Sequence, residues 1–251
     1  MIIDISHHQE PAKINYDKLA KQVELAIIRT QYGSRTLDRH YKTHHKEFRK
    51  RGVPTACYAW VRGIDVKDMR KEATDFYNRT KEFNPTFWFL DVEEQSMDNM
   101  RVGVSAYVDT LRKLGAKKIG IYIAHHLYRQ FNLDLSKVDA VWIPHYGKNN
   151  GAVTSKPDFP CDIHQFTERG ILNGCTDYLD LNRLTGTKSI NFFTNKEEVG
   201  KMDKNKPSSW AKESWEWAKK EGYLDGNRPN DFMTREEFSV VLKKIISKNK
   251  L

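Results

Sequence analysis

The stretch FWFLDVEEQ (87–95) passes directly from bulky apolar residues into three acids. Uninterrupted apolar runs of this kind are typical of strands that are covered on both sides, as in a parallel sheet. Side chains two residues apart point to the same side of a strand, so Asp91 and Glu93 should share a side with the two phenylalanines that precede them. The stretch therefore predicts a pair of acids at the end of a buried strand, above an aromatic floor.

Two carboxylates held close together over an apolar floor cannot both ionise cheaply. The pKa of one of them should rise, which is what a general acid at neutral pH requires. Carboxylate clusters also suit Mg²⁺ or Ca²⁺, and a strand-ending Asp is often a helix cap or a turn residue. We favour acid–base chemistry because Glu93 is a poor cap, and we expect no metal ion and no cofactor.

Eight β-rich segments can be identified, at residues 2–6, 25–33, 54–61, 86–93, 117–124, 139–147, 162–168 and 178–184. Helix-like stretches separate several of them, at residues 38–52, 65–83 and 98–115. Apolar strands that alternate with amphipathic helices predict a parallel sheet covered by helices. Eight strands favour a closed, irregular β/α barrel, and an open doubly wound sheet is the alternative.

Two further strands carry acids near their ends. Asp4 follows the first apolar run, and Asp180 stands in the last one with Asn182 two residues later. The carboxyl ends of barrel strands converge on one face, where barrel active sites are built. First and last strands are neighbours in a closed barrel, so Asp4 and Asp180 should lie close together and beside Asp91 and Glu93.

Aromatic residues stand near several strand ends and offer flat faces for stacking on a sugar, although each also fits a core position: Tyr32, Tyr58, Tyr122 and Trp142. The histidines are less informative, because none of the three His-His pairs has the spacing of an HExxH metal site. His44 and His45 fall on a basic helix-like stretch. We expect these two side chains to be exposed.

The net charge of +9 and the pI near 9.3 indicate an anionic partner or a well-solvated basic surface. Such a partner would be nucleic acid or a polyanionic surface such as a bacterial cell wall. No nucleic-acid motif accompanies the charge, so the well-solvated surface is an equal alternative. The three cysteines have neither zinc nor disulfide spacing. The opening MIIDISHH has no signal-peptide pattern, and no apolar window is long enough to span a membrane. We therefore expect synthesis in a cytosol and export by another route.

The composition of the chain changes after the last predicted strand. Residues 1–186 form the expected barrel domain, residues 187–207 a polar linker, and residues 208–251 a small helical module. Ser209 and Thr234 are expected helix caps, Thr234 with Glu237 in a capping box. The expected core of the module sets one group of side chains against another: Trp210, Trp217 and Ala218 against Phe238, Val241 and Ile245. Such a short module is marginal alone and should need a partner copy or the main domain.

Six stretches together carry a family resemblance: IDIS (3–6), FLDVE (89–93), IGIYIA (119–124), AVWIPHYG (140–147), IHQFT (163–167) and LDLNRL (179–184). In this order they resemble glycoside hydrolase family 25, the lysozymes of the muramidase type, over residues 1–186. The resemblance implies an irregular β/α barrel. It also implies hydrolysis of the β-1,4 bond from N-acetylmuramic acid to N-acetylglucosamine in peptidoglycan.

The resemblance also implies roles for individual residues. Glu93 would be the general acid, and Asp91 would orient the substrate acetamido group or stabilise the developing positive charge. Asp4 and Asp180 would complete the acidic cluster. Substrate contacts would come from Tyr58, Trp142, Tyr32, Tyr122, Gln165 and Asn182. The strand spacing of the two acids falls between the distances of inverting and retaining enzymes and leaves the stereochemistry open. The resemblance implies substrate-assisted hydrolysis through the 2-acetamido group.

The stretch 210–238, WAKESWEWAKKEGYLDGNRPNDFMTREEF, is similar to a single S-layer homology repeat. This resemblance implies binding to secondary cell-wall polymers, and association between chains would supply further copies. The whole chain fits a phage endolysin that is made in the host cytoplasm and reaches the wall after holin-dependent release. The alternatives are a non-catalytic wall-glycan-binding protein and a glycosidase that acts on another N-acetylated glycan.

Overall fold

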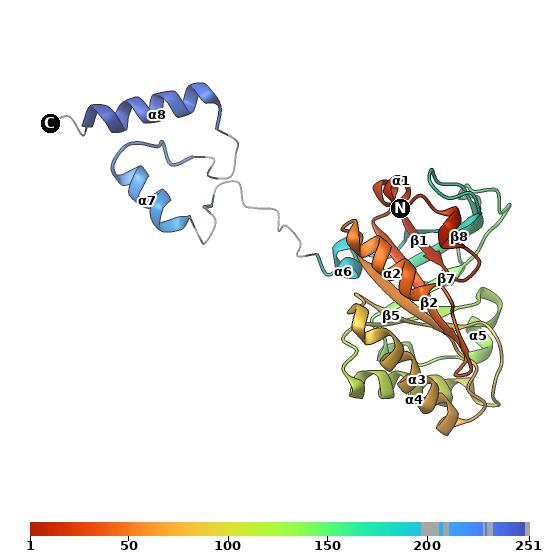
Figure 1. Cartoon of the computed structure of the whole chain (residues 1–251). Coiled ribbons are helices and arrows are strands. Elements are labelled where there is room, and N and C mark those ends of the chain that lie inside the picture. Colours follow the sequence, from red (N-terminus) through yellow and green to blue (C-terminus); the bar gives the residue numbers. More distant parts are fainter. Residues whose placement is uncertain (197–205, 208–210, 228, 230–232, 249–251) are drawn as a thin grey trace. The chain divides into compact units, whose positions relative to one another are not determined.

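The computed structural model describes residues 1–196, 206–207, 211–227, 229 and 233–248 (Figure 1). The chain divides into two compact units, Met1–Asn195 and Lys196–Leu251. Within the described residues, no helix is long and apolar enough to cross a membrane.

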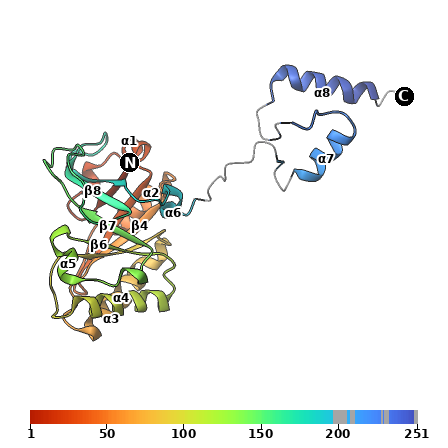
Figure 2. The ribbon, with the colours of Figure 1, turned by 180° about the vertical axis from the view of Figure 1, so that it is seen from behind.

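The first unit is a closed barrel of eight strands with helices around it (Figures 1 and 2). The strands are β1 (Ile2–Ile5), β2 (Leu25–Tyr32), β4 (Thr55–Trp60), β5 (Trp88–Val92), β6 (Ile119–Ile123), β7 (Ala140–Pro144), β8 (Ile163–Gly170) and β9 (Leu179–Leu184). β1 closes the barrel because it pairs with both β2 and β9. A short strand, β3 (Thr36–Leu37), folds back on β2. The predicted closed barrel is confirmed.

One strand runs against the expected direction. β9 is antiparallel to both of its neighbours, β8 and β1, whereas we expected every strand to be parallel. Parallel strands need a crossover of about a dozen residues or more, and the connection 171–178 is too short for one. The chain therefore returns as a hairpin, and β9 begins at the barrel face where β1 ends.

Three long helices cover the outside of the sheet, α2 (Tyr41–Lys50), α3 (Val66–Thr80) and α4 (Met100–Leu114). They match the three helix-like stretches of the sequence. Asp65 and Asn99 cap α3 and α4 by accepting hydrogen bonds from backbone N–H groups of the first turn. α4 ends at Gly115, whose φ of 110° favours glycine.

Short helices complete the first unit: α1 (Tyr16–Leu19), α5 (Tyr128–Phe131) and α6 (Ile190–Thr194). Single 3-10 turns lie at Pro11–Lys13, Ala20–Gln22, Lys81–Phe83, His125–Leu127 and Leu135–Lys137. The segment 187–195, which we expected in the linker, belongs to the compact first unit. Phe193 of α6 is fully buried, and its ring centroid lies 5.3 Å from that of Phe87.

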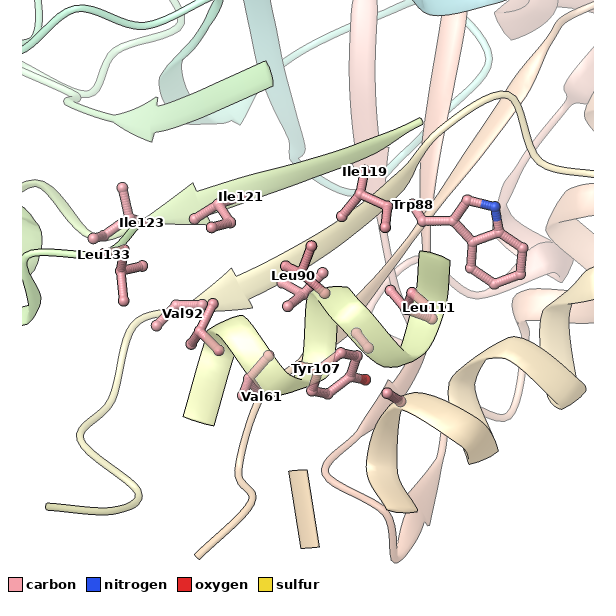
Figure 3. Close-up of a cluster of buried hydrophobic side chains, with 14 of the residues drawn as sticks. Val61, Trp88, Leu90, Val92, Tyr107, Leu111, Ile119, Ile121, Ile123 and Leu133 are labelled. Atoms are coloured by element: carbon pink, nitrogen blue, oxygen red, sulfur yellow. The ribbon is translucent and has the colours of Figure 1, made fainter. Parts of the chain in front are cut away.

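The two sides of β5 serve two different cores. Trp88, Leu90 and Val92 face outward and pack against α3 and α4 (Figure 3). Phe87 and Phe89 face inward, into the cluster that fills the barrel. A Cβ on Gly120 of β6 would lie 2.3 Å from a ring carbon of Phe89, so glycine is what leaves room for this ring. The interior of the barrel below the acids is therefore filled by packed side chains.

The prediction that His44 and His45 are exposed is wrong. Both side chains are fully buried, because Tyr41, His44, His45 and Phe48 form the inner face of α2. His44 Nδ1 lies 2.7 Å from the Tyr16 hydroxyl. Burial lowers the pKa of His44 to about 4 and that of His45 to about 3. Both are neutral helix-packing residues.

The second unit contains two helices, α7 (Lys212–Lys220) and α8 (Arg235–Lys248). The predicted capping box is confirmed, since the Thr234 N–H donates to Glu237 (2.8 Å) and the Glu237 N–H donates to Thr234 Oγ1 (3.1 Å). Ser209 and Trp210 lie outside the described residues. The predicted core is wrong for Trp217 and Phe238, because both are more than half exposed.

Candidate active site

Four acids meet at the barrel face where the parallel strands end. Asp4 of β1 is paired in register with Asp180 of β9. Asp91, which ends the inward-facing row of β5, pairs with Trp60 of β4, and Glu93 follows directly after the strand. The electrostatic influence of these acids on one another's pKa values shows that they form one cluster. The expected gathering of the four acids is what the structure shows.

Asp4 is held by amide donors on both of its oxygens. The Gln165 side chain donates to Oδ1 and Oδ2 (2.9 and 3.1 Å), and Asn182 donates to Oδ1 (2.7 Å). Asn182 is in turn fixed by Trp142, whose indole N–H donates to its Oδ1 at 2.8 Å. This chain holds Asp4 in one orientation. Burial raises the pKa of Asp4, and the two amides oppose the rise.

Gln165 is oriented from its other end by two phenols. The hydroxyl groups of Tyr122 and Tyr146 both donate to Gln165 Oε1, at 2.9 and 2.7 Å. An amide whose oxygen accepts twice must point its N–H₂ group at Asp4. The sequence suggested Gln165, but its two phenolic partners come from β6 and from the loop after β7, and they could not be paired from spacing alone.

Asp180 lies beside Asp4 in the β1–β9 pair. Burial, followed by the charge of Asp4 and a hydrogen bond to it, raises the pKa of Asp180 well above its usual value. The same hydrogen bond lowers the pKa of Asp4. Of the two carboxyls, Asp180 therefore holds a proton more tightly than Asp4.

Asp91 and Glu93 have the raised proton affinity that two crowded acids should have. Burial, and then the charge of Glu93, raises the pKa of Asp91 well above its usual value. Asp91 Oδ1 is shielded and has no hydrogen-bond partner in the described part of the chain, which adds to the cost of ionising this carboxyl. Burial and the neighbouring charges of Asp4 and Glu94 raise the pKa of Glu93 to about 7.

Arg29 is a component of the site that the sequence analysis missed. It is only 8% exposed and occupies an inward position of β2, where its Nε donates to Asp38 at 3.2 Å and its Nη2 contacts His7 Nδ1. Its charge lowers the pKa values of Asp91 and Glu93 and so opposes the effect of burial. A lone Arg within the apolar run LAIIRTQY was the available signal.

The predicted aromatic contacts fall into two groups. Tyr58, Tyr122 and Trp142 are buried, with Trp142 only 1% exposed, so they form the floor under the acids rather than faces for stacking. Tyr32 lies at the rim, where its ring contacts Trp60 at 5.0 Å and the Arg62 guanidinium at 4.6 Å. Of the four, Tyr32 is the one that is not buried.

Two hollows flank the cluster. One of about 460 Å³ is lined by residues that include His7, Arg29, Tyr32 and Trp60. The other, of about 780 Å³, has Asp180, Glu168 and Tyr178 in its wall. His8 lines both hollows. Asp180 borders one of the hollows and Arg29 the other.

The acid cluster is not arranged as a metal site. Among the described residues, no group of three or more His, Cys, Asp or Glu could hold a metal ion. The contacts of Asp4 agree with this, because Gln165 and Asn182 direct N–H groups at its oxygens, where a cation would need bare oxygen ligands.

The comparisons with known proteins agree with this geometry. Residues 3–175 match the model of the glycosyl hydrolases of family 25. GHIP, a glycosyl hydrolase 25 of Streptococcus pneumoniae described as participating in host cell invasion, is 38% identical over 78% of this chain and 91% of its own, with a TM-score of 0.74. A search of curated protein sequences gave no match.

Two further solved structures share the fold. The catalytic domain of the endolysin ply40, from bacteriophage P40 of Listeria monocytogenes, is 27% identical over 77% of this chain and 96% of its own, with a TM-score of 0.71. The lysozyme of Streptomyces coelicolor is 17% identical over 77% of this chain and 96% of its own, with a TM-score of 0.63. The family match spans more than half of the chain and covers the barrel from β1 to β8, with Asp4, Asp91 and Glu93, whereas Asp180 on β9 lies just beyond it. The chain therefore belongs to the glycosyl hydrolases of family 25 and is a glycoside hydrolase.

Proposed function

We propose that this hydrolase cleaves the β-1,4 bond from N-acetylmuramic acid to N-acetylglucosamine in peptidoglycan. The observation that carries the proposal is Glu93, a half-buried carboxyl whose pKa is raised to about 7 beside the more deeply buried Asp91. Such a group is still protonated near neutral pH, and it is accessible enough to reach a glycosidic oxygen. Glu93 is the general acid that protonates the leaving group.

Asp91 is the second carboxyl of the proposed reaction centre. It lies on the inward side of β5, two residues before Glu93, and its environment disfavours a free charge. The charged form of a carboxyl in this setting is stabilised most by a nearby positive charge or by an N–H donor. Asp91 therefore accepts from the substrate acetamido N–H and stabilises the positive charge that develops as the bond breaks.

The product ends test the proposed bond. Purified Gram-positive peptidoglycan is digested, the new ends are reduced with borohydride, and the fragments are identified by mass spectrometry. Reduced muramic acid is the expected new end. New glucosamine ends would instead show a glucosaminidase on the same scaffold. Binding to the wall without any cleavage, by a folded protein, would favour the non-catalytic alternative.

The pH dependence of hydrolysis tests the role of Glu93. The reaction needs Glu93 protonated, so kcat/KM on a soluble glycan fragment should fall as the pH rises through about 7. Well above this pKa, the decrease should approach about tenfold per pH unit. The measurement is a series of initial rates between pH 5 and pH 9. A rate that stays level to pH 9 would contradict the assignment.

The biological setting is proposed on broader grounds. The net charge of +9 favours association with an anionic wall. The likeness to the catalytic domain of a phage endolysin supports a lytic role. We therefore propose a phage endolysin that is made in the host cytoplasm and reaches the wall through a holin pore. The second unit would add affinity for secondary wall polymers.

A further inference from the structure

The hollow of about 460 Å³ beside Arg29 carries more positive than negative charge. Arg29 and Arg39 both line it, and Asp38 is the one acid among the described residues of its wall. The carboxylate of Asp38 is engaged within the chain. Its Oδ2 accepts from Arg29 Nε (3.2 Å) and from the backbone N–H of His7 (2.8 Å), and its side chain is 0% exposed. The two guanidinium groups therefore give the wall of the hollow a net positive charge.

This wall also holds N–H groups that have no acceptor. Arg29 uses its Nε and Nη2 for Asp38 and for Nδ1 of His7, and within the described chain its Nη1 has no hydrogen-bond partner. Burial and the charge of Arg29 lower the pKa of His7, so its neutral ring accepts at Nδ1 and carries its proton on Nε2. Trp60 also lines the hollow, and its shielded indole Nε1 is likewise unpaired among the described residues. Buried N–H groups normally find an acceptor, so these donors favour a ligand that brings one.

Another part of the wall is apolar. Tyr32 and Trp60 line the hollow with their ring centroids 5.0 Å apart, and Leu37, which is 47% exposed, lines it as well. An inorganic anion would leave these side chains in contact with water, whereas a carboxylate that carries a methyl group would cover part of them. The wall therefore suits a short ligand with one charged and one apolar part.

The hollow lies next to the reaction centre. Trp60 is paired in register with Asp91, and His7 follows Asp4 by three residues. The charge of Arg29 acts on the carboxyl of Asp91, whose pKa it lowers. An anion bound in the hollow is therefore close enough to the acids to be a substituent of a sugar at the cleaved bond.

We propose that the hollow bounded by Arg29, Arg39 and His7 binds a carboxylate of the substrate, in the form of a –CH(CH₃)–COO⁻ group. This inference rests on the proposed function, because the muramic acid residues of peptidoglycan supply this group in two ways. A muramic acid without peptide carries it as its free lactyl group, and a peptide-bearing one carries it at the terminal alanine of the stem. The guanidinium groups donate to the carboxylate, and Leu37 and Tyr32 contact the methyl group.

Two other roles account for less of the hollow. A purely structural role explains the contacts of Arg29 with Asp38 and His7, but it does not explain Arg39. Within the described chain, the exposed side chain of Arg39 bonds only to the adjacent His40. A phosphate of a wall polymer would match the charge, but it would leave the apolar part of the wall uncovered.

Cleavage of glycans with and without charged carboxyls tests the proposal. Purified glycan strands are prepared with stem peptides and, after amidase treatment, without them. Part of each preparation is converted to the carboxamide with carbodiimide and ammonia. The unmodified full chain should show a kcat/KM about tenfold higher on the intact than on the amidated form, the usual effect of a hydrogen bond to a charged group. The preparation that shows this preference identifies the source, either the lactyl group or the terminal alanine.

Arg39→Gln removes one cation of the hollow. It should reduce the preference to about threefold or less, through a higher KM for the intact form. Arg35→Gln is the matched control, because this exposed arginine belongs to the same loop but lines a different hollow. It removes the same charge and should keep the full preference. Thermal unfolding confirms that both variants are folded.

Three results would overturn the proposal. The first is equal cleavage of intact and amidated glycans by the unmodified protein, and the second is an unchanged preference in Arg39→Gln. The third is stronger competition by glycerol phosphate than by lactate, which would assign the hollow to a phosphate-bearing polymer. In all three, glycans are still cleaved and reduced muramic acid is still the new end, so the proposed function stands. No cleavage of either glycan would instead overturn the proposed function and this inference with it.

Discussion

Glu93→Gln should lower kcat on peptidoglycan by about 10²–10⁴-fold, the usual contribution of a general acid. Glutamine keeps the size and polarity of the side chain, but it cannot give a proton to the leaving oxygen. The half-buried position and the pKa of about 7 make Glu93 the acid of the site that is protonated and still reachable. The measurement is the rate of turbidity loss of purified walls, with the amount of bound protein determined in parallel.

Glu94→Gln is the matched control, because the neighbouring acid points to the other side of the chain. Glu94 forms an ion pair with Arg62 at the surface, and such pairs contribute little. Because the charge of Glu94 contributes to the raised pKa of Glu93, the two variants are compared at pH 5.5, where Glu93 is protonated, and Glu94→Gln should leave turnover there within about twofold. Glu93→Gln should still bind walls as the unmodified protein does. Equal loss in both variants would point to damage to the loop, and full activity of Glu93→Gln would remove it from the mechanism.

Glu72→Gln should stabilise the protein at pH 8 and change little at pH 5. Glu72 lies on α3, is 1% exposed and accepts from the Arg62 N–H. Burial raises its pKa to about 8 from 4.5. The folded protein therefore binds this proton more tightly than the unfolded chain does. Stability is fullest below the unfolded pKa and is lost as the pH rises towards 8.

Glutamine cannot ionise, so the variant avoids this loss. The free energy of unfolding at pH 8 should rise by on the order of 3 kcal/mol. This is less than the full pKa shift of Glu72 would give, because local relaxation reduces the cost of the buried charge. For a unit of this size, the rise corresponds to about 5–10 °C in Tm. Thermal unfolding at pH 5 and pH 8 measures it. Glu82→Gln removes an exposed carboxyl that pairs with Lys42 and should change Tm little at either pH. An equal gain from Glu72→Gln at both pH values would rule out ionisation as the cause.

The strands and the acids were readable from the sequence because both leave local signals. FWFLDVEEQ shows a buried strand and its acidic end within nine residues, and period-two geometry then fixes which side Asp91 occupies. The direction of β9 was missed, although the short connection 171–178 carried the information. Asp180 nevertheless reaches the predicted place, because an antiparallel strand that starts at this face brings its first residues there.

Contacts between distant strands could not be read in the same way. The bonds from Tyr122 and Tyr146 to Gln165, and from Trp142 to Asn182, join residues whose partners are chosen by barrel closure. The basic composition of α2 predicts an exposed His44. Which side of the helix is buried depends instead on how α2 packs against the barrel, which composition does not show. Arg29 was passed over because a charge in a strand is informative only once its direction is known.

α6 has a consequence for protein engineering. Phe193 packs on Phe87, at the start of the strand that ends in Asp91, so the chain leaves the barrel at the end opposite the acids. Asn195, the last residue of the first unit, therefore lies at the end of the barrel opposite the acids. A different targeting module can be spliced after Asn195 with its attachment point away from the cleft. A junction at residue 186 would instead remove the Phe193 side chain that seals the barrel end.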